Sequence, residues 1–173
     1  RTAATIKGGR RFSFSAMVVC GDRQGRVGLG YGKANQVPNA IEKAQKKAKR
    51  VMRKFPLTGT TIPHEVTGRF GACTVRLVPA SPGTGVTAGA AVRAVLDLVG
   101  VQDCLSKAYG STNNKNLSKA VIDGLQQLRS RETVQALRKV EIEKTHTEQS
   151  QEAVPSVVPS EVAVEESSEV AAK

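Results

Sequence analysis

A segment near the middle of the sequence limits what this chain can fold into. Residues 56–68 contain Pro56, Gly59, Pro63 and Gly68 among threonines. This composition is typical of a linker or loop-rich connection. The 173 residues suffice for two small cores, because domains well below that length fold alone. We therefore predict two domains, over residues 1–58 and 69–143, followed by a tail over residues 144–173.

The sequence before this linker predicts a hairpin and one helix. Alternate positions of residues 11–20 are apolar, as in a half-buried strand, and the alternation resumes over residues 26–33 after a turn at residues 21–25. Pro38 suits the first turn of a helix, which we expect over residues 38–55. Its apolar stripe is predicted to comprise Ile41, Ala44, Ala48, Val51, Met52 and Phe55.

The sequence after the linker alternates predicted strands and helices. Strands are expected over residues 72–79 and 101–108. A nearly all-apolar helix over residues 88–99 should be covered on most sides. Capping side chains at residues 111–114 predict another helix start, and residues 129–143 could form a last short helix. This alternation favours an α/β layer.

Positive charge is concentrated at the start of the chain. The first 60 residues hold fourteen basic side chains and two acidic ones, whereas residues 145–173 hold six Glu and one Lys. The tail has no hydrophobic periodicity, so we expect it to be disordered. A basic body with an acidic tail is typical of a protein whose partner is a polyanion. No apolar run is long enough to span a bilayer and Arg1 begins no signal-peptide pattern, so nucleic acid is favoured over a membrane.

Two features carry the predicted phosphate contacts. On the expected helix, a basic stripe lies about 200° from the apolar one and Glu42 is the one nearby acid. Before the first strand, Gly8 and Gly9 are flanked by cations, so backbone and guanidinium groups could both approach a phosphate. A solvated helix surface and an ordinary hairpin loop are the alternatives. The full predicted RNA-binding set is Lys7, Gly8, Gly9, Arg10, Arg11, Phe12, Arg23, Lys33, Lys43, Lys46, Lys47, Arg50, Arg53 and Lys54.

Two glycine-rich segments need separate interpretations. Gly28, Gly30 and Gly32 alternate as on one strand face and lack the spacing of a phosphate-binding loop. They favour a bare sheet face that receives the helix or RNA. The turn over residues 79–89 precedes a helix and supports a rival hypothesis, a nucleotide enzyme, because a helix N-terminus can bind phosphate. Asp97 is the one nearby carboxylate such an enzyme could use.

The sequence gives little support for a metal site, a cofactor site or a catalytic nucleophile. His64 and His146 are the two histidines, and the cysteines at positions 20, 73 and 104 have no metal-ligand spacing. Buried free thiols are the simpler interpretation. We therefore predict no enzyme, no metal site and no cofactor. A free-standing duplex-RNA or DNA binder stays an open alternative.

Several motifs together resemble a known family. They are K-G-G-R-R-F-S-F at residues 7–14, V-G-x-G-Y-G-K-A at residues 27–34, V-P-N-A-I at residues 37–41, P-A-S-P-G-T-G at residues 79–85 and K-A-Y-G-S-T-N at residues 107–113. Their order is similar to that in the bacterial-type S-five family of small-subunit ribosomal proteins, over roughly residues 4–140. The combination is far more specific than any single motif.

The resemblance implies an α+β protein with two domains. The first would be similar to a double-stranded RNA-binding domain, an antiparallel sheet with one packed helix, and the second an α/β domain with a left-handed βαβ crossover. Family members usually begin further upstream, so the edge strand is expected to be truncated. The tail from Thr145 has no family counterpart, and fold alone does not give activity.

The resemblance also implies a function in translation. The loop at residues 7–12 would reach small-subunit (16S-type) rRNA near the spectinomycin site. Gly85 and Arg93 would contact the neighbouring S-four protein at a boundary that influences decoding accuracy. Further expected partners are the S-eight protein and mRNA near its entry path. The expected location is the cytoplasmic ribosome, and an organellar ribosome stays possible.

Overall fold

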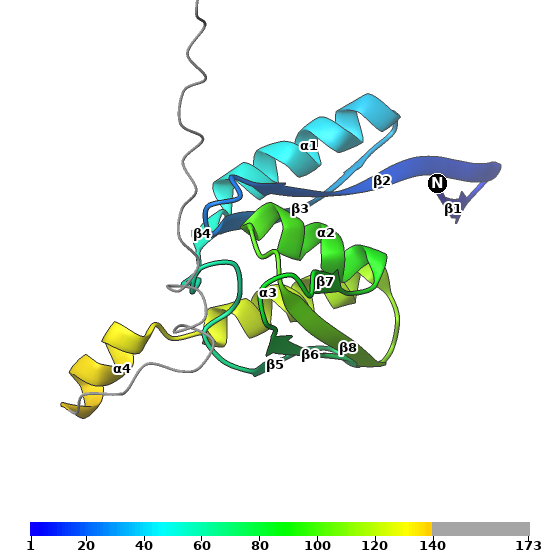
Figure 1. The fold of residues 1–173 in the computed structure, drawn as a ribbon. Coiled ribbons are helices and arrows are strands. Elements are labelled where there is room, and N and C mark those ends of the chain that lie inside the picture. The colour runs from blue at the N-terminus through cyan, green and yellow to red at the C-terminus, as the bar shows by residue number, and fades with distance from the viewer. Residues whose placement is uncertain (140–173) are drawn as a thin grey trace, which may run out of the picture.

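Two four-stranded sheets organise the molecule. The computed structural model describes residues 1–139, in which the sheet orders are β1-β2-β3-β4 and β5-β6-β8-β7 (Figure 1). The first sheet carries one helix and the second carries helices of its own. The predicted α+β class is confirmed, and the first domain has the expected antiparallel sheet with one packed helix.

The N-terminal sheet is antiparallel throughout. Its edge strand is short: β1 has 5 residues and pairs only with the beginning of the 13-residue β2, from Gly9 to Ser13. Both project beyond the rest of the molecule as a hairpin (Figure 1). The elements are β1 (Thr2–Ile6), β2 (Gly9–Gly21), β3 (Arg26–Ala34), α1 (Val37–Arg50) and β4 (Arg53–Lys54).

Glycines on β3 let α1 approach the sheet closely. A Cβ atom added at Gly30 would lie 1.9 Å from the Ala44 carbonyl oxygen, and Gly28 and Gly32 are equally crowded by α1. The helix presents Ala40, Ala44 and Ala48, which are almost completely buried. The prediction that this glycine face receives a packed element is confirmed, and the packed element is the helix.

The end of α1 and part of its apolar stripe were predicted wrongly. The helix ends at Arg50 rather than at Phe55, and the chain then turns to form β4. Phe55 is buried and its N–H donates to the Gly25 carbonyl at 2.7 Å. Ile41 is 45 % exposed, because Ala40, which shares a face with Ala44 and Ala48, takes the buried position at the start of the helix.

The C-terminal sheet is mixed. β5 pairs with β6 and β6 with β8 in antiparallel orientation, while β7 runs parallel to β8. α2 connects β7 to the parallel strand β8, which gives the expected βαβ unit. The left-handed sense of this crossover stays a prediction. The elements are β5 (Val66–Phe70), β6 (Cys73–Pro79), β7 (Val86–Thr87), α2 (Ala90–Val99), β8 (Cys104–Gly110), α3 (Asn114–Gln127) and α4 (Arg131–Arg138).

Several boundaries differ from the sequence prediction. β5 begins at Val66, inside the segment predicted as a linker, and the strand expected at 101–108 is shifted to β8. α2 is buried on one side only, through residues such as Val92 and Leu96, whereas Arg93, Ala94 and Asp97 are exposed. Small alanines made this helix look apolar all round.

The end of the described chain differs as well. α4 is shorter than the helix predicted over residues 129–143, and none of its residues is buried. Residues of that prediction beyond Lys139, and the predicted tail, lie outside the described residues. No helix among residues 1–139 is long and apolar enough to cross a membrane.

The two sheets share one continuous core. Val27 and Phe55 of the first domain belong to the same buried cluster as Leu77, Leu96 and the other core residues of the second. Backbone hydrogen bonds connect the 21–25 turn to the end of α2, with the Arg23 N–H donating to Leu98 at 3.1 Å and the Gly25 N–H to Val99 at 2.8 Å. These contacts hold the domains in a fixed relation.

Candidate nucleic-acid interface

The tip of the projecting hairpin is an exposed, cationic turn. Ile6 pairs with Gly9, so Lys7 and Gly8 form the turn between them. Gly8 has φ +89°, a conformation that side chains disfavour, and an added Cβ there would meet nothing within 4 Å. The backbone at this tip is therefore open to close approach by a large partner.

Cations flank this tip on both hairpin faces. Successive strand residues point to opposite faces, so Arg10 and Phe12 lie on one face and Arg11 on the other. All three are exposed. The Arg1 guanidinium stacks 4.4 Å from the Phe12 ring centroid, and the Thr2 hydroxyl bonds to Ser13 across the strands. The predicted loop residues, Lys7 to Phe12, therefore lie together at the end of the β1–β2 hairpin, which is accessible from both faces.

The outer surface of α1 forms the second cationic group. Lys43, Lys46, Lys47 and Arg50 are all exposed. Lys46 and Arg50 lie on the side of the helix away from its buried alanines, and Lys43 and Lys47 lie along one flank of that stripe. Within residues 1–139 none of the four makes an ion pair or a side-chain hydrogen bond with the protein. Glu42 is the one acid on this helix and forms no ion pair with them, so most of their charge is uncompensated and leaves a positive field at the surface.

The remaining predicted RNA contacts lie elsewhere. Arg53 and Lys54 are on β4 and not on the helix, although both are exposed. Lys33 is exposed on the β3 face opposite the glycines, and therefore on the side away from α1. The fourteen predicted residues do not form one continuous surface.

Arg23 belongs to a different neighbourhood. It has φ +59° in the 21–25 turn and lines a surface hollow together with Arg93 and Asp97. Asp22 shapes this turn by accepting hydrogen bonds from the Gln24 and Arg26 N–H groups at 2.8 and 3.0 Å. The Gln24 N–H in particular holds the pKa of Asp22 below its ordinary value. The turn therefore keeps Arg23 beside the second domain.

Gly85 and Arg93, the predicted protein-contact residues, occupy one corner. Gly85 directly precedes Val86 of β7, and the Arg93 guanidinium donates to the Val86 carbonyl at 2.7 Å. Gly85 has φ +76° and open space around it. The structure thus brings both residues together on an accessible surface.

Two buried polar residues that sequence reasoning missed hold this corner in place. The Asp103 carboxylate accepts the Gly85 N–H at 2.9 Å, and Asp103 is buried. The Thr61 hydroxyl donates to the Asp103 carbonyl at 2.6 Å and accepts the Ala80 N–H at 3.3 Å. Both ends of the loop at residues 80–85 are anchored. The sequence signal that could have identified Asp103 as a buried polar residue is its position in an apolar segment, between Val101 and Cys104.

The same region lacks the geometry expected of the rival nucleotide enzyme. Asp97 lies in the second half of α2, about 10 Å along the axis from the helix start that follows the glycine-rich turn. The thiol of Cys104 is nearby in the fold, but burial raises its pKa to about 11. It therefore stays protonated near neutral pH and is a poor nucleophile. Cys73 is also buried and Cys20 is partly buried.

Comparison with known proteins identifies relatives along most of the chain. A family model described as "Ribosomal protein S5, N-terminal domain" matches residues 1–56, and one described as "Ribosomal protein S5, C-terminal domain" matches residues 68–138. The protein named "Small ribosomal subunit protein uS5" from Syntrophobacter fumaroxidans is 56 % identical over 142 residues, 82 % of this chain and 86 % of its own length. Those from Rhodopirellula baltica and Thermus thermophilus are each 55 % identical, over 80 % and 82 % of this chain and 78 % and 87 % of their own lengths.

Proposed function

The chain belongs to the ribosomal protein S5 family, and from this premise we propose that it is a structural component of the small ribosomal subunit that binds 16S-type rRNA. Its role is to position RNA and protein neighbours, and it has no catalytic step. The domains proposed for this role are residues 1–58 and 69–143, the second extended forward to include β5 from Val66, with the acidic tail at residues 144–173 as a separate segment.

The observation that carries the RNA proposal is the exposed, unpaired charge on α1 and on the hairpin. Lys43, Lys46, Lys47 and Arg50 extend from one rigid helix that the glycine face of β3 fixes in place. Such a group costs self-repulsion in the free protein, and RNA phosphates relieve it. Contacts of this kind position a protein on the RNA backbone with little reading of base edges.

The hairpin supplies a different contact. Its tip is narrow, open around Gly8 and flanked by Lys7, Arg10 and Arg11. Arg forks hold a phosphate through two hydrogen bonds, and the glycine lets the backbone approach it. This geometry supports insertion of the hairpin into RNA while α1 lies along the RNA backbone. The resemblance to the family implies that the insertion is near the subunit neck, close to where spectinomycin would bind.

The Gly85–Arg93 corner is proposed to contact the neighbouring S-four protein. Asp103 and Thr61 anchor its loop, and Arg93 is fixed on Val86, so the corner can form a defined protein boundary. Stability of that boundary would influence decoding accuracy. Contacts with the S-eight protein and with mRNA near its entry path, in a cytoplasmic ribosome, complete the proposal.

The test of RNA binding is its salt dependence. If six to eight phosphates are neutralised, the logarithm of the association constant for 16S-type rRNA falls with the logarithm of salt concentration by about 0.7 to 0.9 per contact. Replacing Lys43, Lys46, Lys47 and Arg50 together by Gln reduces this slope by about three. The control replaces three exposed cations outside the proposed interface, Arg129, Arg138 and Lys139, by Gln and leaves the slope unchanged. A flat salt dependence of the unmodified protein contradicts the proposal.

A further inference from the structure

The second sheet has one face that no described helix covers. α3 packs against β5 and β6, and α2 against β7, on the side where Cys73, Val75 and Leu77 are buried. The strand registers place the alternate residues on the opposite side. This open sheet face comprises Thr67, Arg69, Thr74, Arg76, Val78, Thr87, Leu105, Lys107 and Tyr109.

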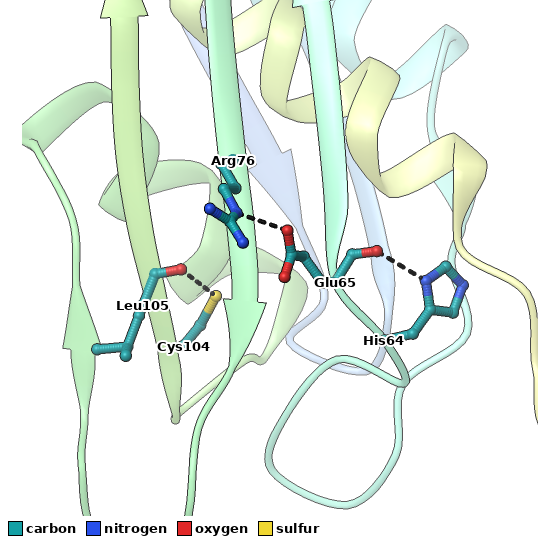
Figure 2. A network of polar contacts seen from close by, with 5 residues as sticks. All are labelled: His64, Glu65, Arg76, Cys104 and Leu105. Atoms are coloured by element: carbon teal, nitrogen blue, oxygen red, sulfur yellow. Dashed lines mark hydrogen bonds and ion pairs between the residues drawn. The ribbon is translucent and has the colours of Figure 1, made fainter.

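The open sheet face carries positive charge without an acid of its own. Arg69, Arg76 and Lys107 are its charged members, and all three are exposed. Glu65, just before β5, reaches Arg76 and forms an ion pair with it (Figure 2). This pair lowers the pKa of Glu65 and raises that of Arg76. Both side chains are about half exposed, so the pair is weak and a phosphate can displace it.

The register groups these side chains into rows across the sheet. Arg76 pairs with Lys107, Thr74 with Tyr109, and Val78 with Leu105. Successive rows on one face are about 7 Å apart. A shallow hollow of about 290 Å³ is lined by Arg76, Val78, Leu105, Ser106, Lys107 and Tyr109. A cationic row therefore lies between an exposed aromatic ring and an apolar patch.

We propose that the open sheet face binds a short single-stranded segment of RNA, with one base stacked on Tyr109 and the flanking phosphates on Arg76 and Lys107. This goes beyond the proposed function, because it assigns a second RNA surface that does not depend on α1 or the hairpin. Tyr109 is 51 % exposed, so its ring is available as a stacking platform. Stacking requires an unpaired base, which excludes the paired bases of a duplex.

The chemistry of the face favours RNA over a protein. The centre of a protein interface is apolar and depleted of Lys and acidic residues, although Tyr and Arg are enriched there. Here the cations Arg76 and Lys107 lie at the centre, and the apolar pair Val78 and Leu105 lies to one side. Arg69, Arg76 and Lys107 are balanced only by Glu65, so the net positive charge of the face complements a polyanion. An exposed sheet that combines basic and aromatic side chains is a geometry that single-strand binders use.

The experiment measures binding of a fluorescently labelled oligouridylate of about eight nucleotides to the full chain. All variants carry Gln at the cations of α1 and of the hairpin, which removes the contribution of both surfaces: Lys7, Arg10, Arg11, Lys43, Lys46, Lys47 and Arg50. Tyr109→Ala weakens binding by about five- to a hundredfold, whereas Tyr109→Phe keeps the stacking ring and binds normally. Arg76→Gln and Lys107→Gln each reduce the salt slope by about 0.7, and the control Arg138→Gln does not.

Two further variants sharpen the test. Glu65→Gln frees Arg76 from its ion pair and tightens binding of the oligouridylate. The chain has two tyrosines and no Trp, so in a Tyr31→Phe variant the fluorescence reports Tyr109 alone, and stacking with the unlabelled RNA quenches it.

The outcomes separate this proposal from the function proposed above. Binding that is unaffected by Tyr109→Ala, with no fluorescence quenching, overturns the single-strand site even when rRNA binding through α1 holds. If Tyr109→Ala instead leaves oligouridylate binding intact but removes a neighbouring protein from assembled subunits, the face is a protein contact and the RNA proposal is wrong. Circular dichroism verifies that each variant is folded.

Discussion

Substitution of Gly30 tests whether the glycine face of β3 sets the position of the basic helix. A Cβ on Gly30 would lie 1.9 Å from the Ala44 carbonyl oxygen and 2.6 Å from the Ala48 nitrogen, both backbone atoms that cannot rotate away. Reaching an ordinary contact distance would require α1 to move away from the sheet by about 1.5 Å. A gap of even 0.5–1 Å between packed atoms already loses roughly a quarter to a half of the van der Waals energy of each contact.

The expected cost follows from this geometry. Ala40, Ala44 and Ala48 are nearly fully buried against the sheet, so a retreat of α1 weakens all three contacts at once. Overpacking of this kind costs roughly 1–3 kcal/mol and occasionally more. We expect Gly30→Ala to lower the free energy of unfolding by about 3 kcal/mol. For a chain of this size that corresponds to a fall in Tm of about 6–12 °C.

Thermal and urea unfolding followed by circular dichroism measure this change. The matched control is Gly89→Ala, since Gly89 has φ −68° and an added Cβ would meet nothing within 4 Å. Its stability should change by less than about 1 kcal/mol. A Gly30→Ala protein that is as stable as the unmodified chain, or more stable, would refute the close-approach argument.

Two further predictions concern buried groups of the second domain. Asp103→Ala leaves the Gly85 N–H without its acceptor and should lower the free energy of unfolding by about 2 kcal/mol, with faster hydrogen exchange at Gly85 in NMR. Asp103→Asn keeps an acceptor oxygen and should lower it by less. Equal exchange at Gly85 in the unmodified protein and both variants would contradict this. The pKa of Cys104 is raised to about 11, so the unfolded chain loses the thiol proton first as pH rises. The free energy of unfolding should therefore fall between the ordinary thiol pKa and about pH 11, more steeply than in Cys104→Ala, and parallel pH profiles would refute the assignment.

Periodic patterns made much of the fold predictable from the sequence. Alternation over β2 and β3, Pro38 at the start of α1 and Asn113 as a helix cap are local signals, and the Asn113 side chain does accept the Lys115 N–H at 3.1 Å. The exposed cations of α1 and the hairpin follow from the same patterns. Such features depend on neighbours in the sequence, which is why they could be found without a structure.

The features that were missed depend on contacts between distant residues. Phe55 continues the helical spacing of α1, yet it is drawn into the shared core once the chain turns at Val51. The short strand β7 exists because β8 lies beside it. Arg23 is placed beside Arg93 by backbone hydrogen bonds to α2 that no local pattern indicates.

The central claim is that the basic side chains of α1 meet RNA phosphates in a permanent assembly. Chemical acetylation of lysines, read by mass spectrometry, tests it by comparing the free protein with small subunits that have incorporated it. Lys43, Lys46 and Lys47 are exposed in the free chain and should react readily there, and they should be strongly protected in the subunit. Equal reactivity of these three lysines in both states would contradict the claim.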